Sequence, residues 1–191
     1  MPQQVASTTD AGDGIVAIDT EYVRPLMDAS HLIVQDGRGA FVDTGTNDSV
    51  PLLLDALGRQ GLGVDDVDYV FLTHIHLDHA GGAGELMQRL PDARCVVHPR
   101  GARHMIDPER LVKGTIAVYG AERMREMYGD IVPIDAERVV VADDGDDLLE
   151  TGLQQRLRGA AHHRLTADRQ RQLVDRTHAA RLAGGQQDRR H

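Results

Sequence analysis

The stretch from Val67 to His79 constrains the fold of this chain more than any other part of its sequence. An almost continuously apolar run, 67–73, predicts a strand that is covered on both faces, as in the sheets of α/β proteins. The residues that follow this strand at once include His74, His76, Asp78 and His79. Ligand sites in α/β sheets gather at the carboxyl ends of strands, which is where this cluster stands. A chance cluster among the 10 histidines is the alternative, but the spacing and position favour a metal site.

The residue types in this loop are those that zinc prefers, namely neutral imidazoles and carboxylates. In a locally extended stretch His74 and His76 project to the same side and can hold one ion. Asp78 and His79 follow a bend and can reach a second ion. Asp43 ends an earlier strand, and we expect it to accept a proton from an imidazole that binds metal through its other nitrogen. The hydroxyl of Thr73 is available to orient a neighbouring ligand, and the Gly81-Gly82 pair permits a tight turn into the next helix.

The remaining pattern predicts a layered α/β or α+β fold, in which strands alternate with helices after two initial strands. We expect strands at 14–19, 31–35, 39–43, 67–73, 93–98 and 139–141, and helices at about 50–61, 83–90 and 122–128. Asp36-Gly37 indicates a hairpin turn between the second and third strands. The first helix should be capped by Asn47 or Asp48, and the helical pieces within 101–130 should be broken at Pro108, Gly114 and Gly120.

The length of 191 residues and the 41% apolar content suit one domain with a real core. The single cysteine, Cys95, excludes an internal disulfide, and its apolar surroundings predict a buried, inert thiol. No signal peptide or membrane span is evident, so we expect a cytoplasmic protein. Residues 1–155 carry 12 basic and 27 acidic residues, a balance of −15, which argues against broad nucleic-acid binding. Self-association into an oligomer is left open.

The pattern T-H-x-H-x-D-H-x-G-G at residues 73–82 resembles the signature of the metallo-β-lactamase superfamily, and the nearest likeness is to its glyoxalase-II-like hydrolases. Asp43-Thr44-Gly45 resembles the early D-x-G turn of that family, and 98–108 resembles a segment of one of its subgroups. The resemblance covers about residues 13–155. It implies an αββα sandwich with a metal pair at one edge, His74 and His76 on the first ion, and Asp78 and His79 on the second. Asp78 is also implied to orient the attacking water.

The end of the chain departs from this family. The family completes its site with a further histidine, a bridging aspartate and a last histidine, and none of them matches cleanly here. His162 or His163 can replace the first of these, and we take His163 as the candidate ligand. Residues 156–191 hold 9 basic and 3 acidic residues and little apolar patterning, which predicts a divergent, poorly ordered basic tail after a domain that ends near residue 155. The tail is either divergent but functional, with a partner chain completing the site, or frameshifted or truncated. We favour the second interpretation, in which the fold is incomplete at its C-terminus.

These features predict a metal-dependent hydrolase that cleaves an ester, thioester, lactone or related bond of a small molecule. One or two zinc ions would supply hydroxide at neutral pH and polarise the substrate carbonyl. A catalytically impaired remnant that still binds metal is one alternative, and an iron-dependent oxidoreductase of the same fold is another. His98 and His104 flank a glycine-containing turn, where a solvated role fits them better than a place at the substrate entrance.

Overall fold

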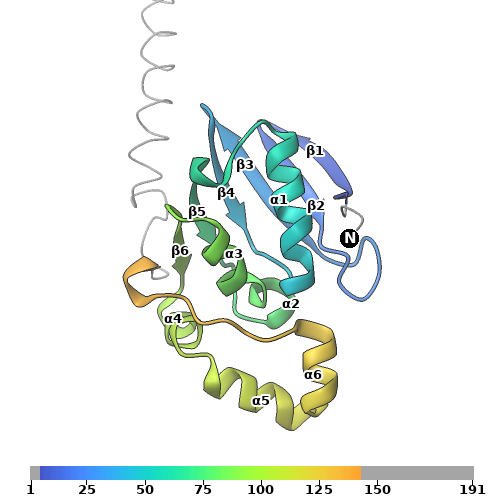
Figure 1. Ribbon diagram of the computed structural model, residues 1–191, viewed down its shortest axis with the longest axis vertical. Helices are drawn as coiled ribbons and strands as arrows, with labels where there is room; N and C mark the ends of the chain where they lie inside the picture. The colour runs from blue at the N-terminus through green and yellow to red at the C-terminus, as the bar shows by residue number, and fades with distance from the viewer. Residues whose placement is uncertain (1–4, 143–191) are drawn as a thin grey trace, which may run out of the picture. The chain divides into compact units, whose positions relative to one another are not determined.

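One seven-stranded sheet organises the part of the chain that the computed structural model describes, residues 5–142. The strands follow one another across the sheet in chain order (Figure 1), and they are β1 (Thr8–Gly12), β2 (Ile15–Asp19), β3 (Ala29–Gln35), β4 (Arg38–Val42), β5 (Val67–Phe71), β6 (Arg94–Val97) and β7 (Val139–Val141). The first four pair antiparallel, whereas β4 to β7 pair parallel. Antiparallel hairpins followed by parallel crossovers through helices make an α/β fold, as the sequence predicted.

The helices of the described residues fill the connections between the parallel strands. α1 (Val50–Arg59) joins β4 to β5, and α2 (Leu77–Ala80) and α3 (Ala83–Arg89) join β5 to β6. α4 (Pro99–Ile106), α5 (Glu109–Tyr119) and α6 (Ala121–Tyr128) lie together near one end of the sheet, between β6 and β7 (Figure 1). None of these helices has the length and hydropathy that crossing a membrane requires.

The main core lies between the helices and one face of the sheet. The register aligns Val16, Leu32, Phe41, Val70 and Cys95 in one row across five strands, and all five are buried. The apolar side of α1 that the sequence predicted packs on this face, and its buried members are Leu52, Leu53, Ala56 and Leu57. Complete burial of such aliphatic side chains stabilises the fold by about 1.5–3 kcal/mol each.

The opposite face of the sheet differs from the sequence prediction. The pattern of 67–73 predicted a strand covered on both faces; in the structure Tyr69 and Phe71 are half-buried, whereas Val67 and Val70 are fully buried. A continuous apolar run shows that a strand is apolar on both faces, but it does not report how closely each face is packed. The described residues form one sheet with helices on one face. The predicted tail, 156–191, which includes His162 and His163, lies outside the described residues.

Two local predictions were wrong, and one strand was missed. Gly114 does not interrupt the helix 109–119, because one glycine costs a helix only about 1 kcal/mol. The first helix is preceded by a short turn at Asn47–Ser49, and its N-cap is Ser49, not Asn47 or Asp48. The polar strand β1 carries no apolar signal, since it lies at the edge of the sheet and is mostly exposed.

Candidate metal centre

Two loops meet at the carboxyl edge of the parallel strands. β4 ends at Val42 and leads to Asp43, while β5 ends at Phe71 and leads to the histidine loop. The strands are parallel neighbours, so both loops leave the sheet at the same edge. The backbone N–H of Asp43 donates to the carbonyl of Phe71 at 2.8 Å, which joins the two loops where they begin.

Backbone contacts hold the rest of the two loops together. The backbone N–H of Thr44 donates to the carbonyl of His79 at 2.7 Å, and that of Gly82 donates to the carbonyl of Gly45 at 2.9 Å. A Cβ atom on Gly82 would lie 2.5 Å from the carbonyl oxygen of Thr46, so a side chain has no room there. The glycine pair therefore permits close packing of two backbones, in addition to the tight turn that the sequence predicted.

The Asp43 carboxylate lies at the centre of a hydrogen-bond network that joins the two loops. The residue is 6% exposed, and its backbone has a φ of 58°, a left-handed conformation that aspartate tolerates better than most residues. Its Oδ1 accepts from the backbone N–H of Thr73 at 2.8 Å, and its Oδ2 accepts from the Thr73 hydroxyl at 2.7 Å. The Nδ1 of His79 lies 3.2 Å from the same Oδ2. The carboxylate thus binds the start and the end of the histidine loop.

This network determines which ring nitrogens are available to a metal. A carboxylate can only accept hydrogen bonds, so the Thr73 hydroxyl donates its single proton to Asp43. The Nδ1 of His74, which lies 3.0 Å from that hydroxyl, must then be the donor of the second bond. The Nδ1 of His79 likewise donates to Asp43. In both rings the Nε2 atom retains its lone pair, which is the form that a divalent cation requires.

The side chains singled out in the sequence analysis cluster in space. The ring centroids of His74 and His76 lie 4.8 Å apart, and those of His74 and His79 lie 4.2 Å apart. The Oδ2 of Asp78 is 3.9 Å from the Nε2 of His79. The rings of His74 and His76 are exposed, so a small molecule can reach them from solvent.

Asp43 is itself near enough to be a ligand. One donor atom from each of Asp43, His74 and His79 lies within 4.8 Å of the other two. Yet both Asp43 oxygens are already occupied by donors from the protein, which favours an orienting role over direct coordination. Asp28 also lies near this group, with its Oδ1 3.8 Å from the Nδ1 of His79. No pattern in the sequence indicated a place for Asp28 in the site.

A second cluster of apolar residues anchors the histidine loop to the helices that follow. Leu77, between His76 and Asp78, is buried against Met124 and Tyr128 of α6. The Tyr22 ring stacks on Tyr128 at 5.9 Å, and the two hydroxyl oxygens are 3.1 Å apart. Burial raises the pKa of Tyr128 most strongly, and its bond to Tyr22 adds to this effect. No local pattern could reveal this pair, because 106 positions separate its members.

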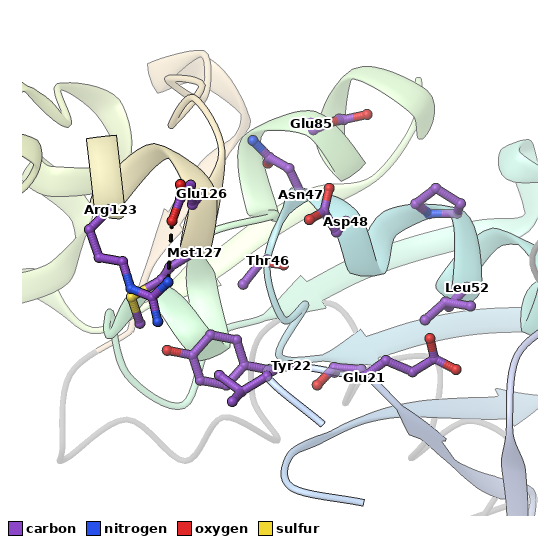
Figure 2. A pocket seen from close by; sticks show the side chains of 13 residues that line it. Glu21, Tyr22, Thr46, Asn47, Asp48, Leu52, Glu85, Arg123, Glu126 and Met127 are labelled. Carbon is purple, nitrogen blue, oxygen red and sulfur yellow. Dashed lines mark hydrogen bonds and ion pairs between the residues drawn. The ribbon is translucent and has the colours of Figure 1, made fainter. Parts of the chain in front are cut away.

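A cavity of about 670 Å³ adjoins this cluster. Figure 2 shows Tyr22 at its margin, with Arg123 and Glu126 of α6 joined by an ion pair on one side and Asp48 on the other. The volume falls in the range of small-molecule sites. It is lined by side chains from the β2–β3 loop, the start of α1, α3 and α6, so it forms only when these segments fold together.

Comparison with known proteins identifies the relatives of this arrangement. The sequence profile of the metallo-beta-lactamase superfamily matches residues 23–169. A hydroxyacylglutathione hydrolase of Stenotrophomonas maltophilia is 42% identical over 83 residues, which are 44% of this chain and 30% of that enzyme. One from Xanthomonas axonopodis pv. citri is 48% identical over 61 residues, 32% of this chain and 22% of that enzyme.

Solved structures show the same fold at lower identity. The subclass B3 metallo-beta-lactamase MEM-A1, from a soil metagenome library, aligns with a TM-score of 0.53 at 17% identity over 75% of this chain and 48% of its own. BJP-1 of Bradyrhizobium japonicum, of the same subclass, aligns at 0.52 and 22% identity over 73% and 46%. The matches cover less than half of these solved chains and less than a third of the curated enzymes. The domain boundary at residue 155 stays a prediction.

Proposed function

Because the chain belongs to the metallo-β-lactamase superfamily, we propose that it is a metal-dependent hydrolase whose centre is the loop 74–79. One observation carries this proposal: the Asp43–Thr73 network leaves the Nε2 atoms of two clustered imidazoles as lone-pair donors. A cluster of solvated surface histidines would need no such buried carboxylate behind it.

We assign the ligands by their positions. His74 and His76, whose rings are adjacent, would hold one ion, and Asp78 with His79 would hold a second. The donor set of three imidazoles and a carboxylate fits zinc, and iron is the alternative metal. Asp43 would orient His79 directly and His74 through Thr73. Four ligands cannot close two such sites, so a further ligand is required, and His163 is our candidate.

The residues of this loop have separate tasks in the proposed reaction. A bound zinc ion would act as a Lewis acid on a carbonyl oxygen and lower the pKa of water towards neutrality. Asp78 is half-buried beside His79, and its carboxylate would orient the attacking water and accept a proton from it. Leu77 and the tyrosine pair exclude solvent from one side of the loop.

The substrate class follows from the relatives. The curated proteins similar to this chain are hydroxyacylglutathione hydrolases, so a hydroxyacyl thioester of glutathione is the first substrate to test. Simple esters, lactones and amides complete the panel, because one fold of this kind hosts many reactions. The similarity covers less than a third of those enzymes, so the activity of this chain must be measured directly.

The test combines metal analysis with turnover. The full chain is loaded with zinc or iron, freed of excess metal, and assayed for bound ions and for hydrolysis of the panel with and without a chelator. A His74→Ala/His79→Ala variant should lose both metal and activity, whereas His31→Gln on β3 should keep both. His31 is a matched control because its half-buried ring takes no part in the loop.

Each outcome separates the candidate functions. Chelator-sensitive hydrolysis by the zinc form supports the proposal. Tight metal binding without turnover of any substrate rejects the hydrolase and favours the impaired remnant. Iron bound in preference to zinc, together with dioxygen consumption, would point to the oxidoreductase instead.

A further inference from the structure

One face of the sheet carries apolar side chains that no helix of the described residues covers. α1 and α3 lie in front of the sheet in Figure 1, and α4 contributes to the same core as they do. Successive side chains of a strand point to opposite faces, so the residues between the core positions form the second face. The register aligns them in rows, and one row consists of Ala17, His31, Val42, Phe71 and Val96.

This surface, which we call the open face, is almost free of charge. Its second row consists of Ile15, Ile33, Ala40 and Tyr69 and ends at the exposed Arg94, the single permanently charged side chain of the two rows. None of the residues in either row belongs to a buried apolar cluster of residues 5–142. A continuous apolar surface of this kind marks a site of interaction with another molecule or segment.

The open face is large enough for an interface between two proteins. Seven strands with about 4.8 Å between neighbours and about 3.3 Å per residue present roughly 500 Å² of sheet surface. Two such faces together bury about 1,000 Å², which reaches the lower bound for a specific protein–protein interface. Leu26 and Met27, both exposed in the β2–β3 loop, lie at the margin of this face and extend its apolar area.

The shape of the open face is complementary to itself. The large rings of Tyr69 and Phe71 lie side by side on β5, with centroids 5.7 Å apart. Beside β3 lies a hollow of about 420 Å³, whose lining includes Ala17, Leu26, Met27 and His31. β5 and β3 are the two neighbours of β4, the middle strand of the seven. A two-fold rotation about an axis parallel to β4 therefore exchanges β5 with β3, and it brings Phe71 of one copy opposite the His31 position, at the hollow, of the other.

We propose that two copies of this chain form a two-fold symmetric dimer through their open faces, with the Tyr69–Phe71 pair of each copy in the hollow of the other. Packing of two sheets about 10 Å apart is a common way to bury such faces. The rotation preserves the direction of the strands, so both histidine loops lie at the same end of the dimer. Residues 156–191 of the same chain are a poorer cover, because they hold 9 basic and 3 acidic residues and little apolar patterning.

Sedimentation equilibrium of the full chain over a range of concentrations tests the dimer. We expect the wild type to reach twice the mass of one chain. Phe71→Lys introduces a charge at two places in a two-fold interface, so the dissociation constant should rise at least about a hundredfold. Val118→Lys is the matched control, since it replaces an exposed apolar residue of α5 and should leave the dimer intact. Circular dichroism and urea unfolding check that both variants fold.

Cross-linking tests which faces meet and requires no charge in the sheet, so it decides the matter even if Phe71→Lys does not fold. β4 lies on the two-fold axis, so Val42 of one copy faces Val42 of the other. A bismaleimide should therefore join Val42→Cys into a covalent dimer. Gln60→Cys, exposed at the end of α1 on the helical side, should remain a single chain. The native thiol, Cys95, is buried and should stay unreacted in both variants.

Several results would overturn the inference. These are a wild type that is monomeric at every concentration, a folded Phe71→Lys variant that associates as tightly as the wild type, or cross-linking of Gln60→Cys in place of Val42→Cys. A monomeric wild type in which the Val42→Cys thiol does not react would show that a segment of the same chain covers the open face. Hydrolase activity plays no part in these measurements, so the dimer and the proposed function stand or fall separately.

Discussion

Replacing Asp43 with asparagine should weaken metal binding although Asp43 is not a proposed ligand. The carboxylate accepts from the Thr73 backbone N–H, the Thr73 hydroxyl and the His79 Nδ1 at 2.8, 2.7 and 3.2 Å. An amide offers one oxygen and one NH2 group in their place. If its oxygen keeps the backbone N–H, its NH2 group faces the hydroxyl and the ring. The Thr73 hydroxyl then donates to the Nδ1 atom of His74, and the NH2 group donates to the Nδ1 atom of His79. Because Nδ1 now accepts in both rings, each ring carries its own proton on Nε2.

The size of the effect follows from this change of tautomer. Both Nε2 atoms become donors, so each ring must return to its less favourable form before it can bind a cation. Loss of such orienting partners typically costs ten- to hundredfold in metal affinity, or about 1.4–2.7 kcal/mol. In the opposite orientation the amide NH2 group faces the Thr73 backbone N–H, so two donors lie against each other. We expect this orientation to lower the free energy of unfolding of the metal-free protein by about 1–3 kcal/mol.

The assay is a competition titration of zinc against a chromophoric chelator, with imidazole ¹⁵N chemical shifts of the metal-free protein as a readout of the tautomers. Asp28→Asn is the matched control, because that carboxylate is 3.8 Å from the same Nδ1 and beyond hydrogen-bond distance. Zinc affinity of Asp43→Asn equal to that of the wild type, or an equal loss in Asp28→Asn, would refute the reasoning.

Three further predictions concern the framework around the loop. Gly82→Ala places its methyl group 2.5 Å from the Thr46 carbonyl, so urea unfolding should show a loss of about 1–3 kcal/mol, whereas Gly58→Ala, with open space around it, should be neutral or stabilising. Burial raises the pKa of the Cys95 thiol from 9.0 to about 12. The unfolded thiol therefore ionises first, and the free energy of unfolding should fall from about pH 9 to 12 more steeply in the wild type than in Cys95→Ala. Leu77→Ala should cost about 2–5 kcal/mol by urea unfolding and also weaken zinc binding, and unchanged zinc affinity would show that α6 does not support the loop.

The fold class and the outline of the centre could be predicted from the sequence because their signals are local. Alternating apolar runs gave the strands β2 to β7 within a few residues, and Asp36-Gly37 adopts the left-handed φ values of 51° and 76° that its hairpin turn requires. The histidine spacing identified the candidate loop, since three histidines and an aspartate in six residues can be noticed without any distant partner.

Contacts between distant segments were decided by the tertiary structure. Asp43 was suspected from its place at a strand end, yet only folding shows that one carboxylate controls His79 directly and His74 through a hydroxyl. The cover of Leu77 by α6 and the cavity beside Tyr22 join segments far apart in the chain. Such contacts leave no periodic pattern in the sequence, because the residues in contact belong to segments that are far apart in the chain.

Residue order determined that this chain is an α/β domain with a histidine loop. The fold decided which ring nitrogens of that loop remain available, because the carboxylate that accepts from Thr73 and His79 lies 30 and 36 positions away from them in the chain.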